Sequence, residues 1–131
     1  MSGITDLEQL LKRIQPQLQA GEFVFCTVAG PLTEFLPLAP IASFKEAEGL
    51  TLVLTRTAAE AAGLPFEGFF RQITLNVHSS LEAVGLTATV ATRLAAEGIS
   101  ANVIAAFYHD HIFVPAAKAE QALVALAALS C

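Results

Sequence analysis

Apolar residues recur along the C-terminal half of the chain with spacings that predict strands and helices in turn. Alternation from residue 71 predicts a strand whose apolar face is formed by Ile73, Leu75 and Val77. A helix is predicted next, because apolar residues recur at helical spacing: Leu86, Val90 and Leu94. Apolar segments at 99–108 and 112–114 predict two further strands, with the reversal between them at His109-Asp110.

Residues that favour helix ends place the limits of these elements. The run Ser79, Ser80, Leu81, Glu82 has the spacing of a capping box before the helix. Gly98 is expected to end that helix in the left-handed conformation. Pro115 ends the third strand and suits the first turn of a final helix, whose buried face is predicted to contain Leu123, Leu126 and Leu129.

The start of the chain predicts an amphipathic helix. A capping box at Thr5 opens it, and Ala20-Gly21 closes it, with Pro16 ending or bending it on the way. Its apolar stripe is expected to be Leu7, Leu10, Leu11, Ile14 and Leu18.

The remainder of the N-terminal half predicts a small sheet. Residues 22–29 predict a strand, and the proline-rich segment 30–40 predicts a crossover or a short irregular helix. A hairpin is predicted over 41–55, with Gly49 supplying a positive φ after its turn. Thr57 is expected to cap a short helix at 58–62.

The order strand, helix, strand, strand, helix in the C-terminal half is a split β-α-β unit of the ferredoxin-like type. The last strand of such a unit is missing, and either the preceding half or a second subunit could supply it. Because the N-terminal half repeats a strand, a hairpin and a short helix, we expect an α/β (α+β) protein of two imperfect tandem copies, at residues 1–66 and 67–131.

Composition narrows the class of function. The 131 residues are 54% apolar and 15% charged, against typical values of about 45–50% and about 25%. A subunit interface would bury the excess of apolar side chains, so we expect a homodimer. The net charge of −5, without a Lys/Arg cluster, argues against nucleic acid as a partner.

The expected location is a reducing cytoplasm. No apolar run approaches the roughly 18–20 residues that a membrane-spanning helix needs, and the first residues lack a signal-peptide core, so no membrane partner is expected. Cys26 lies in an apolar strand and Cys131 is the last residue. Two cysteines placed in this way are expected to remain thiols.

The residues that carry chemistry do not form an enzyme signature, and no catalytic residue or cofactor is predicted. Ser79 and Ser80 adjoin His78 without a nucleophile elbow, Cys26 has no histidine near it in sequence, and no phosphate-binding glycine loop is present. His109 and His111 would share a strand face and could bind a metal with His78 or Asp110 as third ligand. The simpler interpretation gives these histidines a structural role, and no metal site is predicted.

The turn before the main helix is the candidate ligand site. Amides at a helix N-terminus carry partial positive charge and favour an anionic group such as a carboxylate. Two serine hydroxyls lie in this turn, and Glu82 or Asn102 could meet a ligand's ammonium group. The competing interpretation is that Ser79 and Glu82 only cap the helix.

The segment VGLTATVATRLAAEGISANVI closely resembles the signature of ACT domains. Gly85 opens the helix there, and residues 94–99 correspond to the LAxxGI run that leads into the second strand. The blocks ITLNVHSSLEAVG and FYHDHIFVP resemble small stand-alone bacterial proteins with two tandem ACT-like halves, similar to the regulatory region of aspartate kinases. The resemblance is strong over residues 69–129 and weaker over 1–66.

This resemblance implies two ferredoxin-like βαββαβ halves with antiparallel sheets and helices on one face, and a regulatory role in binding amino acids or similar small molecules. Ligands of such domains sit against the turn between the first strand and first helix. The ligand-binding residues it implies are His78, Ser79, Ser80, Leu81, Glu82, Val84, Gly85 and Asn102. A ligand-free dimerisation or protein-interaction module, and a metal-binding protein using His109 and His111, are the alternatives.

Overall fold

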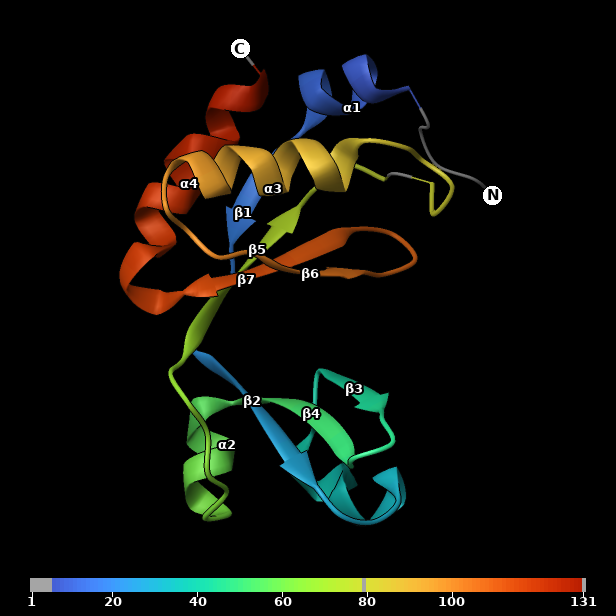
Figure 1. Cartoon of the computed structure of the whole chain (residues 1–131), viewed down its shortest axis with the longest axis vertical. Coiled ribbons are helices and arrows are strands. Elements are labelled where there is room, and N and C mark those ends of the chain that lie inside the picture. The colour runs from blue at the N-terminus through green and yellow to red at the C-terminus, as the bar shows by residue number, and fades with distance from the viewer. Residues whose placement is uncertain (1–5, 79, 131) are drawn as a thin grey trace. The chain divides into compact units, whose positions relative to one another are not determined.

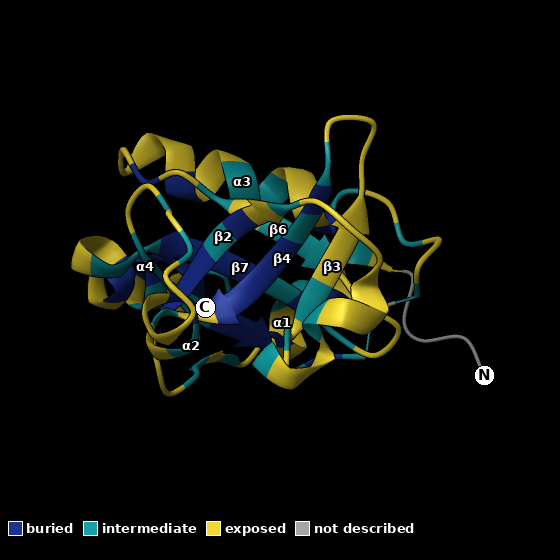
Figure 2. Cartoon of the chain, turned by 90° about the horizontal axis from the view of Figure 1, so that it is seen from below, coloured by how far each residue is buried: buried dark blue, intermediate teal, exposed yellow. Residues whose placement is uncertain are grey.

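A computed structural model of the chain describes residues 6–78 and 80–130. Figure 1 shows the arrangement of its elements and Figure 2 the extent to which each residue is buried. The elements are, in chain order, α1 (Leu7–Arg13), β1 (Pro16–Leu18), β2 (Phe23–Val28), the 3-10 helix η1 (Leu32–Leu38), β3 (Ala42–Lys45), β4 (Leu50–Thr55), α2 (Arg56–Ala61), β5 (Phe70–Leu75), α3 (Leu86–Ala96), β6 (Asn102–Ala105), β7 (Asp110–Pro115), η2 (Ala116–Lys118), α4 (Ala119–Ala127) and η3 (Ala128–Ser130).

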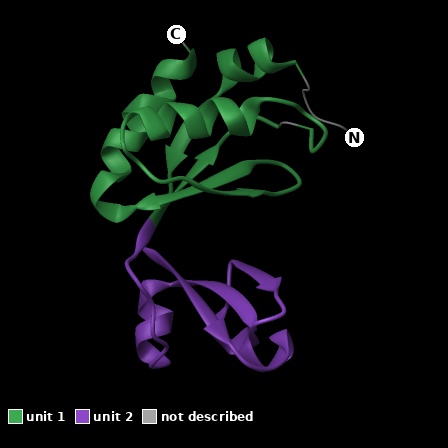
Figure 3. Cartoon of the chain, viewed as in Figure 1, with its two compact units in different colours: residues 1–20, 71–131 green, residues 21–70 purple. Residues whose placement is uncertain are grey.

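The chain forms two compact units that do not follow the order of the sequence. Unit 1 contains residues 1–20 and 71–131, and unit 2 contains residues 21–70 (Figure 3). The chain therefore starts in unit 1, leaves it after Ala20, builds unit 2 and returns at Arg71. The N-terminal helix and the strand after it thus pack with the C-terminal half of the sequence.

Unit 1 has the strand order β1-β5-β7-β6. Its core joins alternate residues of β5 and β7 to all three of its α-helices, so these helices pack on one face of the sheet. The buried residues are Leu10, Ile14, Ile73, Leu75, Val77, Leu86, Val90, Leu94, Ile99, Ile112, Val114, Ala119, Ala122, Ala125 and Leu126. The predicted α3 stripe is confirmed, whereas α4 buries three alanines and only one of the three predicted leucines completely.

The strand missing from the C-terminal half is β1. It pairs antiparallel with β5, Pro16 opposite Leu75 and Leu18 opposite Ile73. The expectation of a helix continuing to residue 20 is therefore wrong, because the backbone leaves the helical region at Ile14 and Pro16 cannot continue the helical hydrogen bonds. Proline is tolerated here because β1 lies at the end of the sheet order within this unit.

Unit 2 is a three-stranded antiparallel sheet in the order β3-β4-β2. The predicted strand at 22–29 and the hairpin at 41–55 are confirmed, and the proline-rich segment forms η1. Six buried residues make its core: Val24, Cys26, Leu50, Leu52, Leu54 and Ala59. Phe70, the first residue of β5, pairs with Phe23 of β2, so β5 begins beside this sheet before it enters unit 1.

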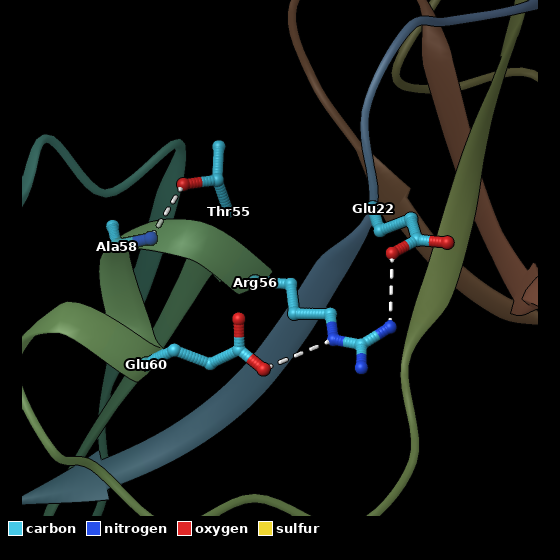
Figure 4. Close-up of polar contacts among 5 residues, drawn as sticks. All are labelled: Glu22, Thr55, Arg56, Ala58 and Glu60. Atoms are coloured by element: carbon cyan, nitrogen blue, oxygen red, sulfur yellow. Dashed lines mark hydrogen bonds and ion pairs between the residues drawn. The ribbon is translucent and has the colours of Figure 1, made fainter.

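Helix α2 is attached to unit 2 by an arginine at its first position. Arg56 forms ion pairs of 3.1 Å with Glu22 and 3.3 Å with Glu60 (Figure 4), and its guanidinium carbon lies 4.0 Å from the centre of the Phe69 ring. The Thr55 hydroxyl accepts from the Ala58 amide, so the cap is Thr55 and not Thr57 as predicted. The helix consequently begins two residues earlier than expected.

Two predicted helix caps differ from those in the structure. Asp6 caps α1 by accepting from the Glu8 amide at 3.0 Å, and Thr5 lies outside the described residues. Helix α3 begins only after Gly85, so the run 79–82 lies too early to cap it. Gly85 itself has φ of 99°, which is why glycine suits that position.

The second hairpin is shorter than the pattern predicts. Strand β6 covers Asn102–Ala105, because the chain reverses at 106–109, where the Ala106 amide donates to the His109 carbonyl. Asp110, expected at the reversal, is instead the first residue of β7 and pairs with Ala105. Among the described residues, no helix is long and apolar enough to span a membrane.

Candidate functional site

The predicted ligand residues lie mainly in the loop between β5 and α3. His78 and Ser80 are half-buried, Glu82 is exposed, and Leu81 and Val84 expose 65% and 83% of their surface. The Ser80 hydroxyl accepts from the Glu82 amide at 3.1 Å, which closes a local turn. Ser79 lies outside the described residues. The loop thus presents a mixed apolar and polar surface.

The start of α3 has amides without a side-chain cap. Gly85 is its N-cap residue, and no side chain in the described part of the chain accepts from the first turn. A Cβ at Gly85 would lie 3.1 Å from Leu7 Cδ2, so α1 packs closely against this end of α3. Uncapped N-terminal amides are the feature that the proposed carboxylate recognition requires.

Two aromatic side chains that were not predicted as ligand residues adjoin this loop. The His78 ring centre lies 5.3 Å from that of Tyr108 and 6.1 Å from that of Phe107. Both aromatic residues belong to the β6–β7 turn and expose about 60% of their surface (62% and 58%). Figure 1 shows that this turn and the loop lie at the same end of unit 1. The apolar run at 99–108 predicts a strand through Phe107 and Tyr108, whereas both residues lie in the turn that follows β6.

Asn102 does not lie with the other predicted ligand residues. It opens β6 and pairs with Phe113, at the opposite end of the hairpin from the Phe107–Tyr108 turn. Its side-chain amide donates to the Phe113 carbonyl at 3.2 Å. The role of Asn102 toward a ligand's ammonium group therefore stays a prediction.

The three histidines are spread over the two loops and β7. The His109 and His111 ring centres are 6.4 Å apart, and His111 Nδ1 lies 3.0 Å from both Gln72 Nε2 and Thr74 Oγ1. Within the described residues, no three His, Cys, Asp or Glu side chains are grouped so that they could hold a metal. The structure therefore gives no support to the metal alternative.

Burial shifts the two titratable groups of β7. It raises the pKa of the Asp110 carboxyl, which His111 and His109 counteract. It lowers the pKa of His111, an effect that His109 reinforces and Asp110 opposes. In unit 2, burial raises the pKa of the Cys26 thiol, which favours its protonated form.

Unit 2 contains a cavity of about 590 Å³ next to the turn between its first strand and the helix η1. This turn corresponds to the loop at 78–85 in unit 1. The turn between β2, its first strand, and η1 forms one side, and the β3–β4 turn forms the other. The lining residues are Ala29, Gly30, Pro31, Leu32, Ser43, Lys45, Glu46, Ala47, Glu48, Gly49 and Leu50. This volume lies in the range of about 300–1,000 Å³ that is usual for small-molecule sites.

The cavity carries both signs of charge. Its lining residues include Lys45, which is cationic, and Glu46 and Glu48, which are anionic. The Thr51 hydroxyl donates to Glu46, although Thr51 pairs with Phe44 and does not itself line the cavity. A zwitterion could place its carboxylate toward Lys45 and its ammonium group toward the acidic side. The prediction missed this site because the strand-to-helix turn was mapped only in the C-terminal half, although Gly30-Pro31 marks the same turn here.

Two family models match this chain, one after the other in sequence order. An ACT domain model matches residues 2–71, and a second ACT domain model matches residues 70–128. A protein of unknown function from Vibrio cholerae, described as a possible transport protein, is 58% identical, covers 99% of this chain and 100% of its own, and superimposes with a TM-score of 0.89. Comparison with curated proteins gave no match.

Regulatory regions of aspartate kinases share the fold. The regulatory subunit from Thermus thermophilus, in its ligand-free form, is 14% identical, with a TM-score of 0.64 over 88% of this chain and 96% of its own. Aspartokinase III from E. coli, in complex with aspartate and ADP, is also 14% identical, with a TM-score of 0.64 over 87% of this chain and 32% of its own. The chain belongs to the ACT domain family and contains two ACT domains in tandem, in an antiparallel ferredoxin-like α+β fold.

Proposed function

We propose that this protein is a non-catalytic regulatory protein that binds a free amino acid. The cavity of unit 2 is the observation that carries the proposal, because it has a sufficient volume and its lining residues include one lysine and two glutamates. Membership of the ACT family supports a regulatory role in ligand binding in general, without specifying the ligand. The loop at 78–85 of unit 1 is the second site that we propose, since it occupies the same strand-to-helix position.

A calorimetric and thermal-shift screen of the purified protein against single amino acids tests the function. Ligand that binds only the folded state raises the melting temperature by mass action. We expect at least one amino acid to raise it at millimolar concentration. If all twenty leave it unchanged, the ligand-binding proposal is wrong.

Two charge-removing variants locate the site. Lys45→Gln removes the cationic group of the cavity, and we expect affinity to fall about 10- to 100-fold, because a charge-assisted hydrogen bond is lost. Lys12→Gln is the matched control, since Lys12 is exposed on α1 in unit 1. Glu82→Gln tests the loop at 78–85 in the same way. Binding that responds to Glu82→Gln and not to Lys45→Gln would assign the site to unit 1.

Subunit association through unit 2 is a second candidate function. Strand β3 is the last strand of its sheet order, and two exposed apolar side chains lie on it or directly before it: Ile41 and Phe44, with exposures of 47% and 71%. An open strand edge next to apolar side chains favours pairing with another chain, here a second copy. Light scattering should therefore report a dimer for the parent protein and a monomer for Phe44→Lys. A monomeric parent protein would exclude subunit association as a function.

A further inference from the structure

Asp110, the first residue of β7, carries a buried carboxylate without a hydrogen-bond partner. It exposes 8% of its surface, and among the described residues it is the only buried residue with a carboxylate. Residues 6–78 and 80–130 supply no hydrogen bond to its side chain, and the titratable groups that act on it are His111 and His109. Burying a carboxylate without a partner costs free energy, so this residue needs an explanation other than the stability of the fold.

The side chain of Asp110 lies on the face of the sheet that the helices of unit 1 cover. Successive side chains of a strand point to opposite faces of its sheet. Ile112 and Val114, two and four residues further along β7, belong to the core that β5 and β7 form with the helices. Asp110 therefore points to the helix side, whereas His111 points to the other side.

Contacts between neighbouring strands place Asp110 at the end of the sheet where α3 begins. His111 Nδ1 lies 3.0 Å from Thr74 Oγ1 of β5, and the Tyr108 ring centre lies 5.3 Å from that of His78, which follows β5. A step forward along β5 is thus a step back along β7, so the two strands are antiparallel. Asp110 lies between these two contacts, level with the end of β5 and next to the loop that leads into α3 (Figure 1).

We propose that Asp110 binds the ammonium group of an amino acid whose carboxylate is held by the amides at the start of α3; this rests on the second site of the proposed function. Helix α3 has 11 residues, and no side chain in the described part of the chain caps its first amides. Those amides favour an anion and Asp110 favours a cation, as the two ends of a zwitterion require. The ammonium group would supply the hydrogen bonds and the positive charge that Asp110 lacks.

Asp110 is better suited to this role than the residues that the sequence suggested for the ammonium group. Glu82 and Asn102 are both exposed, and the side-chain amide of Asn102 donates to the Phe113 carbonyl. A metal ion fits less well, because the described residues contain no group of three His, Cys, Asp or Glu side chains that could hold one. Burial raises the pKa of the Asp110 carboxyl, and an adjacent ammonium group would lower it again.

NMR titration of the isotope-labelled protein with L-alanine, and with propionate as the same molecule without its amino group, tests the role of Asp110. We expect L-alanine to shift the amides of residues 85–88 and the carboxyl carbon of Asp110. Propionate should bind about 10- to 100-fold more weakly, because it cannot form the charge-assisted hydrogen bond. Asp110→Asn should weaken L-alanine binding by a similar factor without weakening that of propionate. Glu97→Gln, at the exposed far end of α3, is the matched control and should bind both as the parent does.

L-alanine that shifts only residues of unit 2, or that binds Asp110→Asn as well as the parent, overturns the role of Asp110 and leaves amino-acid binding in place. L-alanine that shifts nothing also overturns it, and the screen of all twenty amino acids then decides the proposed function separately. If Asp110→Asn fails to fold, the carboxyl carbon of Asp110 in the parent protein gives the answer. Its pKa must fall with L-alanine and not with propionate, and an unchanged pKa contradicts the proposal.

Discussion

Gly49 and Gly85 both stand at turns, and the structure requires glycine at them for different physical reasons. Gly85 has φ of 99°, which side chains other than glycine rarely adopt. Gly49 does not have a positive φ, contrary to expectation; a Cβ there would lie 2.8 Å from Thr27 Oγ1 and 3.2 Å from the Val28 carbonyl oxygen. At Gly49 the constraint is the close approach of β2, which no pattern local to the hairpin reveals.

Gly49→Ala should lower the free energy of unfolding by about 1–3 kcal/mol, because the added methyl group overpacks the contact between the β3–β4 turn and β2. Urea titration measures the change. Thr27→Ala removes the nearest atom. Gly49→Ala should therefore lower the free energy of unfolding less in the Thr27→Ala background than in the parent protein. If the loss is the same with and without the Thr27 hydroxyl, the steric explanation is wrong.

At the scale of elements, α1 and β1 decide how the two ACT halves are completed. The residues of α1 and β1 directly precede those of unit 2 along the chain. Leu10 and Ile14 are nevertheless buried in the core of unit 1. Pro16 separates the helix from the strand, and the three residues of β1 supply the edge that the C-terminal half lacks. The family models divide the chain in sequence order, at 2–71 and 70–128, whereas the packing interleaves the halves.

Leu10→Ala should destabilise the protein by about 2–5 kcal/mol, because it leaves a cavity among fully buried side chains. Leu36→Ala is the matched control; Leu36 is 56% exposed, so we expect a change within about 0.5 kcal/mol. Hydrogen exchange should show the loss of protection in α3, α4 and β5 as well as in α1. Loss confined to residues 21–70 would contradict the assignment of α1 to unit 1.

At the scale of the whole molecule, interleaving makes the C-terminal half dependent on the first twenty residues. A fragment of residues 67–131 lacks β1 and α1, so β5 has an open edge and the core lacks two side chains. An edge strand with an apolar face favours association with other chains.

We therefore expect the fragment 67–131 to lack a cooperative thermal transition when followed by circular dichroism. Adding a peptide of residues 1–20 should restore a transition, since it supplies the missing strand and helix. A peptide of the same composition in scrambled order is the control. A fragment that unfolds cooperatively on its own would show that β1 is dispensable.

Much of the fold was predictable because its signals are local. The strand at 22–29, the hairpin at 41–55, the α3 stripe and the left-handed Gly98 all follow from spacings within a few residues, and the structure confirms them. The loop at 78–85 was located correctly before α3. The cavity of unit 2 and the two aromatic neighbours of His78 were missed, because each depends on which turns lie side by side.

The sequence alone thus determined most of the elements, their approximate limits and the family. The partner of the N-terminal strand was decided by tertiary structure, because strand pairing depends on backbone groups that are distant along the chain: Gln19 and Thr74, hydrogen-bonded at 3.0 Å, are 55 residues apart. The same non-local pairing brings His111 to Gln72 and Thr74.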